Sequence, residues 1–408
     1  MAGDKPAVLL PGGIEASRAL ARRGVAVIAV AQGGSASFRA SRSVSAVVEA
    51  PRSWDERFDR WFDTATFPSG SVILPGNDDA VWWLAGRGAG EAPPFTAARD
   101  VLVKSRLYQR CLEAGVAAPA TWLLEPGAAL PHGPFPMVLK PQTRVGMRHW
   151  IRGWLVRDAA ELSAAVEWFG HNVTYRPREL AAEPLLAHPL VQEYVPRPRR
   201  EVYHLVGYRS RAGESVFAAH VKLLQYPLRF GSGLCFESAE VDSRLAGDLG
   251  RLLASIEFHG IFEAEFVARD GELLLIDLNP RSYNGISLEV ARGYNLPWYL
   301  YLDAIGEIGQ LSRDLARARE LQPPALAWRD GMRFWTMVAA QSVSGGMSPR
   351  QAAGWVRWSL RHRGRMVDPY FARGDLRMGL TMLAQHAGSA FTQPRAFLGT
   401  YVRRGRDR

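Results

Sequence analysis

The sequence has few cysteines and no long apolar segment. Its 408 residues include only Cys111 and Cys235, too few for a disulfide framework, which favours a reducing compartment. No run reaches the roughly 18 apolar residues that a membrane-spanning helix needs. The first residues, "MAGDKPAVLLPGG", lack the basic start and the long apolar core of a signal peptide. We therefore expect a cytoplasmic globular protein, and the length predicts roughly two to four domains.

Lysine is also scarce. Only four of the 50 basic side chains are lysines, namely Lys5, Lys104, Lys140 and Lys222. This skew indicates that arginine has replaced lysine wherever any cation suffices, yet a flexible ammonium is not equivalent to a planar guanidinium at a phosphate site. The three internal lysines are therefore candidates for specific binding. Chance survival is the alternative for any one of them.

Positive charge gathers in the C-terminal region. Residues 350–408 contain 12 arginines and three aspartates, a net charge of +9, whereas the whole chain carries +10. The segment 349–365, "PRQAAGWVRWSLRHRGR", interleaves basic and apolar residues, which suits a helix on the inner face of a membrane or against an anionic partner. A solvated helical appendix is the alternative. No recognised nucleic-acid-binding motif occurs, so we do not expect nucleic acid as a partner.

The N-terminal residues predict an α/β domain with an open sheet. Apolar strands alternate with a glycine turn and a helix over residues 6–31, and "SVILPGNDDAVWWLAG" repeats the strand–turn–helix pattern. Gly12 and Gly13 could approach a ligand, but the absence of G-x-G-x-x-G gives a dinucleotide site little support. Three polar residues follow a predicted strand and are either helix N-caps or the lining of a substrate crevice: Asn77, Asp78 and Asp79.

Residues beyond the N-terminal domain predict an α+β region. We expect one helix over residues 97–115, with three leucines facing the core: Leu102, Leu107 and Leu112. A buried strand should end at Lys140, and the loop after it is basic rather than glycine-rich. Within this loop, Arg144 and Arg148 either contact nucleotide or an anionic substrate, or are solvated.

A predicted hairpin concentrates polar side chains. In "GELLLIDLNPRSYNG", side chains alternate between strand faces, so Asp277, Asn279 and Arg281 share one face if the strand extends that far. Upstream, Glu263 and Glu265 also share a face, and the turn "RDG" would bring Glu265 beside Asp277. Carboxylate and amide oxygens suit Mg²⁺, and a guanidinium suits phosphate or carboxylate. An edge hairpin with a solvated polar face is the alternative.

Taken in order, these segments resemble the ATP-grasp superfamily over residues 98–305. The series is Lys104 before a helix, "MVLKP", "VQEYVP", Glu201, Lys222, "FEAEF" and "LLLIDLNPR". "HVKLLQYPLRFGSG" is similar to a segment of carboxylate–amine ligases related to D-aspartate ligase and carbamoyl-phosphate-synthase-like proteins, which often have Arg-Gln-Tyr-Pro there. The resemblance implies a pre-ATP-grasp domain at 1–97, a core at 98–310 with lobes 98–190 and 191–310, and a basic, mainly helical region at 311–408.

The resemblance also implies which residues bind ATP. Lys104 and Lys140 would hold the α- and β-phosphates, and Lys222 would reach the terminal phosphate. Glu201 would accept hydrogen bonds from the ribose hydroxyls, and backbone groups of Glu193 and Val195 would bind the adenine edge. These two belong to an implied hinge of four residues: Gln192, Glu193, Tyr194 and Val195. Each could instead be an ordinary strand residue, an interpretation that we favour for Gln192.

Three residues are implied ligands of Mg²⁺, with Mn²⁺ as an alternative: Glu265, Asp277 and Asn279. Asp277 stands where many members of the family have glutamate. Arg281 would steady the transferred phosphoryl group or the acyl phosphate. Together with Lys222 and Asn284, it forms the implied catalytic set, and His220 is expected to be a neighbour of Lys222 rather than a catalyst.

In this family a carboxylate attacks the γ-phosphate of ATP, and an amine then attacks the resulting acyl phosphate. The resemblance therefore implies an ATP-dependent ligase that joins a small carboxylate, such as an amino acid, to an amine. A carbamoyl-phosphate-type or kinase-like enzyme and a non-catalytic nucleotide-binding protein are the alternatives. Intact Lys140, Glu265, Asp277 and Asn279 argue against the last. The sequence names neither substrate and leaves the oligomeric state open.

Overall fold

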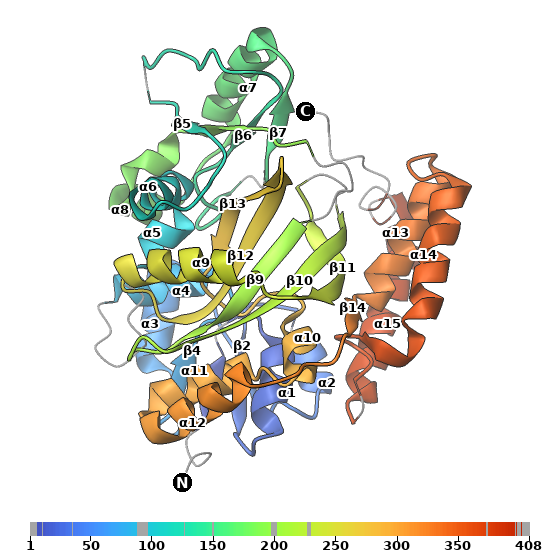
Figure 1. Cartoon of the computed structure of the whole chain (residues 1–408). Helices are drawn as coiled ribbons and strands as arrows, with labels where there is room; N and C mark the ends of the chain where they lie inside the picture. The colour runs from blue at the N-terminus through green and yellow to red at the C-terminus, as the bar shows by residue number, and fades with distance from the viewer. Residues whose placement is uncertain are drawn as a thin grey trace.

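The computed structural model describes residues 6–9, 11–34, 36–87, 97–125, 127–148, 151–196, 202–226, 230–372, 374–395, 397 and 401. In Figure 1 the N-terminal domain lies at the bottom, a small sheet at the top, a large sheet in the centre and the C-terminal helices at the right. Within these ranges, no helix has both the length and the apolar character to span a membrane. Cys111 and Cys235 are buried free thiols.

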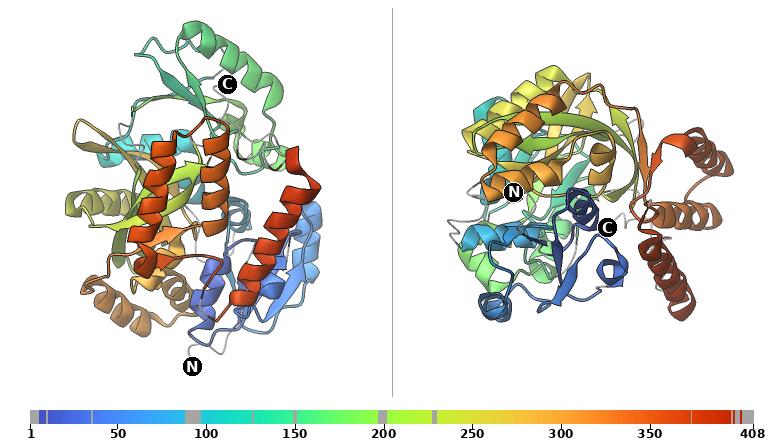
Figure 2. Two further views of the ribbon diagram at one scale, coloured as in Figure 1. Left: turned by 90° about the vertical axis from the view of Figure 1, so that its right-hand side faces the viewer. Right: turned by 90° about the horizontal axis from the view of Figure 1, so that it is seen from below.

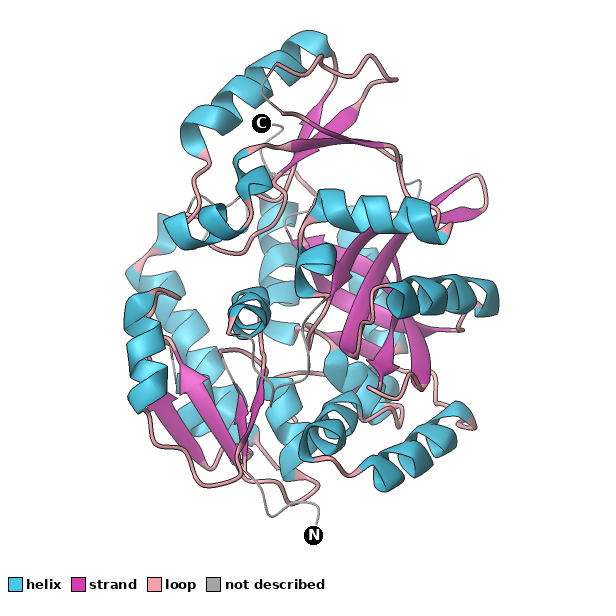
Figure 3. Cartoon of the chain, turned by 90° about the vertical axis from the view of Figure 1, so that its left-hand side faces the viewer, coloured by secondary structure: helices cyan, strands magenta, loops and turns pink. Residues whose placement is uncertain are grey.

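The N-terminal domain is built on the parallel sheet that the sequence predicts. Four strands lie in the order β3-β2-β1-β4: β1 (Ala7–Leu9), β2 (Val27–Ala31), β3 (Ala46–Glu49) and β4 (Val72–Leu74). Its helices are α1 (Ile14–Ala21), α2 (Ala36–Ala40), α3 (Glu56–Thr64) and α4 (Asp78–Gly86). Figure 3 shows these strands at the lower left, apart from the large sheet. Since the strands are parallel, the loops after β1 and β4 open at the same sheet edge.

The small sheet is antiparallel, with strand order β5-β8-β6-β7. Its strands are β5 (Thr121–Leu123), β6 (Met137–Lys140), β7 (Trp154–Val156) and β8 (Leu190–Glu193). The neighbouring helices are α5 (Ala98–Leu102), α6 (Lys104–Ala114), α7 (Ala159–Asn172), α8 (Pro177–Ala182) and the 3₁₀ turn η1 (Pro184–Ala187). Residue 140 therefore ends a strand, as the sequence predicts.

The prediction of a single helix over residues 97–115 is wrong, because the helix is interrupted at Val103. This residue is extended and fully buried, and the next backbone N–H, that of Lys104, donates to the Gln142 carbonyl at 2.9 Å instead of to a helical carbonyl. Leu107 is buried, but Leu112 is 56% exposed, so the prediction that it faces the core is also wrong. Tertiary contacts of Val103 and Lys104 thus override the helical pattern.

The large sheet has seven strands in the order β13-β12-β9-β10-β11-β14-β15. They are β9 (Val202–Arg209), β10 (Ser215–Tyr226), β11 (Ser232–Ala239), β12 (Gly260–Arg269), β13 (Glu272–Asn279), β14 (Ala327–Arg329) and β15 (Met366–Val367). The last two come from the C-terminal region, where the sequence analysis placed no strand. Strands β8 and β9 belong to different sheets, so the chain crosses from one lobe to the other between them.

Helices cover both faces of the large sheet. On one face, α9 (Ser243–Ser255) packs on alternate strand residues such as Leu205 and Phe262. On the other, α10 (Ile286–Ala291), α11 (Leu296–Ile305) and α12 (Ile308–Arg319) accompany α1, and residues such as Val206 and Tyr208 face them. One apolar cluster therefore joins the N-terminal domain to the sheet.

The C-terminal region is mainly helical, as expected. It contains α13 (Gly331–Val343), α14 (Pro349–Arg361), the 3₁₀ turn η2 (Arg363–Arg365) and α15 (Leu376–Thr392). These helices lie on one side of the molecule (Figure 2). α15 packs against α2, and Asp375 at its start pairs with Arg18 of α1 at 2.9 Å. The last helix is thus tied to the first domain.

Candidate active site

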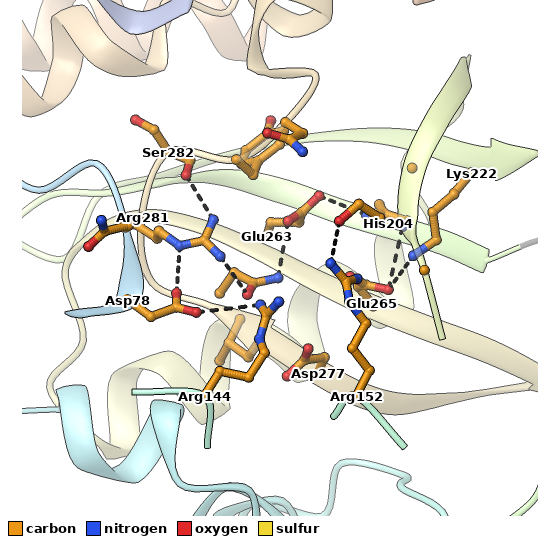
Figure 4. Close-up of a pocket in the computed structure, with 18 of the residues that line it drawn as sticks. Asp78, Arg144, Arg152, His204, Lys222, Glu263, Glu265, Asp277, Arg281 and Ser282 are labelled. Carbon is orange, nitrogen blue, oxygen red and sulfur yellow. Dashed lines mark hydrogen bonds and ion pairs between the residues drawn. The ribbon is translucent and has the colours of Figure 1, made fainter. Parts of the chain in front are cut away.

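A cavity of about 450 Å³ lies where the N-terminal domain, the small-sheet lobe and the large sheet meet. The large sheet contributes the carboxylates of the predicted hairpin, and the small-sheet lobe contributes Lys104 and Lys140. Asp78 of the N-terminal domain also lines the cavity, close to Arg281 and Arg144 (Figure 4). The cavity walls therefore carry both signs of charge from three parts of the chain.

The hairpin β12–β13 has the register that the sequence predicts. Its two-residue turn is Asp270-Gly271, with φ of 51° and 85°, which suits the right-handed twist of the flanking strands. Glu265 lies opposite Asp277, and Glu263 lies opposite Asn279. The strand β13 ends at Asn279, so Arg281 lies beyond it but still lines the cavity.

Each of the two predicted carboxylate ligands is paired with a different lysine. Lys222 Nζ is 2.7 Å from Glu265 Oε2, and Lys104 Nζ is 2.5 Å from Asp277 Oδ1. Lys140 Nζ donates to the side-chain oxygen of Gln192 at 2.6 Å. All three internal lysines line the cavity, which supports their selection from the scarcity of lysine.

The two glutamates of β12 have opposite pKa shifts. Burial acts to raise the pKa of Glu265, but the charges of Lys222 and neighbouring groups outweigh it and lower this pKa. Burial raises the pKa of Glu263, and the charge of Glu265 raises it further. Glu265 is therefore ionised at neutral pH, as a metal ligand must be, whereas Glu263 tends to keep a proton.

Glu263 orients the predicted ligand Asn279. Its Oε2 accepts from Asn279 Nδ2 at 3.1 Å, and its Oε1 lies 3.0 Å from His204 Nδ1. Because the amide nitrogen is occupied, the amide oxygen of Asn279 turns to the other side, where Arg281 donates to it at 3.3 Å. Burial lowers the pKa of His204 to about 3, so this ring is neutral.

A second buried histidine, His220 of β10, packs behind His204. The His220 ring stacks on His204 with centroids 4.7 Å apart, and its Nδ1 lies 3.0 Å from Glu289. Tyr283 donates to the same carboxylate at 3.0 Å. His220 does not line the cavity, so it is a neighbour of the site, as the sequence analysis expected. The alternation "VYHLVG" places His204 on the face of the predicted ligands, a signal that the sequence analysis did not use.

Asn77 and Asp78 each match one of the two interpretations, whereas Asp79 lies outside the cavity lining and accepts from Arg176 at 2.6 Å. Asn77 is the N-cap of α4 and accepts from the Ala80 N–H at 2.8 Å. Asp78 lines the cavity and accepts from Arg281 Nε at 2.5 Å, with Arg144 at 3.5 Å. Burial acts to raise the pKa of Asp78, but these guanidiniums outweigh it and hold the pKa below its usual range. Asp78 is thus a charged crevice residue.

Glu15 links the N-terminal domain to the loop after the hairpin. Its carboxylate accepts from the backbone N–H groups of Gly285 and Ser287 at 3.3 and 3.1 Å, and from Trp328 Nε1 at 3.3 Å. Burial raises the pKa of Glu15 despite these hydrogen bonds. Gly12, which also lines the cavity, has φ of 110°, and a Cβ there would meet the Gly76 carbonyl oxygen at 2.6 Å. The sequence analysis did not single out Glu15.

The predicted hinge lies outside the cavity lining. Gln192 is buried beside Lys140, and Glu193 pairs with Arg269 at 2.8 Å, which joins the small sheet to the large one. Tyr194 is half-buried and Val195 is buried, just after β8. Glu201 and Lys5 are outside the described residues.

The basic loop contributes to the cavity one of the two arginines that the sequence analysis considered, and a third arginine that it did not. Arg144 lines the cavity, whereas Arg148 is exposed and does not. Arg152, which the sequence analysis did not select, lines the cavity and donates to Ser232 Oγ at 2.7 Å. Burial lowers the pKa of Arg152 to about 10, so it stays cationic at neutral pH. Asn284 is an exposed residue of the cavity wall.

Comparisons with known proteins agree on the fold. No protein-family model and no curated protein matches the sequence. Biotin carboxylase from Campylobacter jejuni is similar in structure, with a TM-score of 0.57, 17% identity and coverage of 75% of this chain and 72% of that one. L-amino acid ligase from Bacillus licheniformis has a TM-score of 0.55, 14% identity and 75% coverage of both chains. N5-carboxyaminoimidazole synthetase from Staphylococcus aureus, complexed with ADP, has a TM-score of 0.55, 12% identity and coverage of 75% and 78%.

Proposed function

We propose that this chain, which has the ATP-grasp fold, is an ATP- and Mg²⁺-dependent ligase. It would activate a small carboxylate, such as an amino acid, as an acyl phosphate and join it to an amine. The observation that carries the proposal is the arrangement of charge around one cavity. Two carboxylates and an amide oxygen project from paired strands, and Lys104, Lys140, Lys222 and Arg281 face the same space.

The donor set fits Mg²⁺. Glu265 and Asp277 offer carboxylate oxygens and Asn279 an amide oxygen, which are the hard ligands that this ion prefers. Bound there, Mg²⁺ would neutralise charge on the phosphates of ATP. The same oxygens would accept Mn²⁺. Lys104 and Lys222, which pair with these carboxylates, would then be available to the phosphates.

ATP binding would draw on both lobes. Lys104 and Lys140 suit the inner phosphates and Lys222 the terminal one, because a lysine ammonium binds phosphate as a point charge. The hydrogen bond to Gln192 holds Lys140 at the end of β6, so Gln192 would act by positioning this lysine. The adenine edge would bind to the backbone of Glu193 and Val195, with Tyr194 beside them and Glu201 at the ribose.

The reaction needs positioning and charge rather than a covalent nucleophile on the protein. A substrate carboxylate oxygen would attack the γ-phosphorus, releasing ADP, and the amine nitrogen would then attack the acyl carbon, releasing phosphate. Arg281 lies beside Asn279 and is held by Asp78, so it is placed to stabilise the transferred phosphoryl group. Asn284 on the cavity wall would contact a substrate.

The wider assignments rest on the same fold. We propose a pre-ATP-grasp domain to about residue 97 and a two-lobed core from 98 to 310, followed by the helical region. The chain would act in the cytoplasm on the two small substrates. Assembly of several copies into an oligomer is compatible with this proposal. Phosphoryl transfer without amide formation, of the carbamoyl-phosphate or kinase type, is the competing function, because it would use the same platform.

A phosphate-release screen tests the proposal. The purified chain, ATP and Mg²⁺ are incubated with a panel of amino acids and other small carboxylates, each with and without an added amine. Release that needs both substrates, with an amide product in the mass spectrum, is the expected result. Phosphorylated product without amide would favour the competing function. No turnover with any pair, together with no thermal shift by ADP and Mg²⁺, would contradict the nucleotide site itself.

A further inference from the structure

Helix α15 carries an apolar stripe that no described residue covers. Leu376, Leu380, Leu383 and Phe391 are 59%, 62%, 45% and 85% exposed. Their spacing of four, three and eight residues places them on one face of the helix, and the exposed Ala384 and Ala387 share that face. Met378 lies on the opposite face and Gly379 at the margin between the two faces, and both are buried. The stripe is therefore additional to the contacts that hold α15 in place.

Helix α14 repeats the pattern with arginines beside it. Val356 and Leu360 are 44% and 66% exposed on its outer face, while Trp358 is buried against the large sheet and α13. Arg357 and Arg361 follow these apolar residues directly and are exposed. Apolar side chains with guanidiniums at their margin are the pattern of helices that lie in a membrane interface.

The outer surface of these helices is strongly basic. Within the described part of 349–397, every arginine is exposed: Arg350, Arg357, Arg361, Arg363, Arg365, Arg377 and Arg395. The same range contains two carboxylates against these seven arginines, and neither carboxylate is exposed. Asp375 is buried with Arg18, and Asp368 accepts from the backbone N–H groups of Tyr370 and Phe371.

We propose that the outer faces of α14 and α15 form a docking surface for an anionic lipid bilayer. α14 and α15 lie on one side of the molecule (Figure 2). Their apolar side chains would enter the headgroup layer, and the arginines would pair with lipid phosphates. A second copy of the chain fits less well, because it would bring seven more exposed arginines against the same face. The inference does not depend on the proposed ligase activity.

Vesicle co-sedimentation of the full chain tests the proposal. Vesicles of phosphatidylcholine alone are compared with vesicles of equal parts phosphatidylcholine and phosphatidylglycerol. We expect binding to the anionic vesicles only, and weakening by salt. R357Q/R361Q should lower the affinity for the anionic vesicles about 25-fold, because each arginine contributes about five-fold. L380S/L383S/F391S should abolish sedimentation.

Matched controls distinguish the proposed docking surface from nonspecific effects of exposed arginines and exposed apolar side chains elsewhere. R244Q/R251Q removes two exposed arginines from α9, and L112S removes an exposed leucine from α6, so both should bind vesicles like the parent chain. Thermal melting checks that all variants fold. Equal binding to both vesicle types, or unchanged binding by both test variants, would overturn the proposal. A dimer that L380S/L383S/F391S dissociates, without vesicle binding, would overturn it in favour of self-association.

Discussion

The hairpin β12–β13 and the C-terminal helices differ in how far apart in sequence their contacting residues lie. In the hairpin, Glu263 and Asn279 are 16 residues apart, and strand register alone brings them together. In the C-terminal region, Asp375 depends on Arg18, which is 357 residues away. Alternation and turn chemistry predict the first kind of contact. Nothing local to residue 375 predicts the second.

The sharpest test of the hairpin is Asp277→Asn. This change keeps the size of the side chain but removes the charge opposite Glu265 that a divalent cation requires, so we expect turnover to fall roughly a thousand-fold or more. The thermal shift with ADP plus Mg²⁺ should shrink more than the shift with ADP alone. Glu272→Gln, at an exposed position of the same strand, is the control and should change neither. Full activity of Asp277→Asn would remove the metal platform.

Lysine replacement tests the electrostatic part of the same platform. Lys140→Ala and Lys222→Ala should each reduce ATP turnover roughly a hundred-fold, because each removes a cation that lines the cavity. Lys5→Ala, outside the described residues, should have no effect. Steady-state kinetics with ATP as the varied substrate provide the measurement. Equal activity of all three variants would contradict the inference from lysine scarcity.

Glu263→Ala tests whether Glu263 orients the amide of Asn279, the proposed metal ligand. Without its acceptor the amide can rotate, so the Mg²⁺ concentration for half-maximal activity should rise roughly thirty-fold while the KM for ATP changes little. Glu263→Gln should restore most of the affinity, because its amide can still accept from Asn279 and donate to His204. Parallel rises of both constants in Glu263→Ala would indicate a general structural role instead.

A smaller effect is expected at the contact that ties α15 to the N-terminal domain. Burial acts to raise the pKa of Asp375, but hydrogen bonds from Ser41 and Arg42 and the charge of Arg18 lower it overall. A lowered folded-state pKa stabilises the fold above the ordinary carboxyl pKa, and the contribution disappears as pH falls through the folded value. Asp375→Asn should therefore lower the free energy of unfolding by about 1.5 kcal/mol at pH 7.

Urea unfolding at two pH values measures this contribution. The difference in unfolding free energy between parent and Asp375→Asn should narrow as pH falls below about 4, because the unfolded carboxylate is protonated first and the folded one only at its lower pKa. A constant difference at all pH values would show that the loss comes from packing and not from the ion pair. Asp314→Asn is unsuitable as a control, because the half-buried Asp314 carboxylate accepts a hydrogen bond from Trp298 Nε1 at 3.0 Å. Asp248→Asn, whose partner Arg251 is exposed, is better matched.

The sequence predicted best where chemistry and register coincide. The hairpin turn and the pairing of Glu265 with Asp277 follow from local patterns, and the scarcity of lysine in the chain pointed to the three lysines that line the cavity. It predicted worst where distant segments decide the outcome. The helix is interrupted at Val103, where the Lys104 N–H donates to the carbonyl of Gln142, and β14 joins a sheet edge provided by β11. Likewise, only the folded chain shows that Arg152 and not Arg148 reaches the cavity.

The hydrogen bonds of Glu15 have a consequence for attempts to shorten the protein. This carboxylate fastens the backbone at Gly285 and Ser287, on the chain segment that follows Arg281, from 270 residues upstream. A fragment beginning at residue 98 would contain every residue proposed to bind metal or phosphate, yet it would leave those two N–H groups without their acceptor. It would also lose Asp78, the partner of Arg281. The smallest autonomous form of this site therefore includes the first domain.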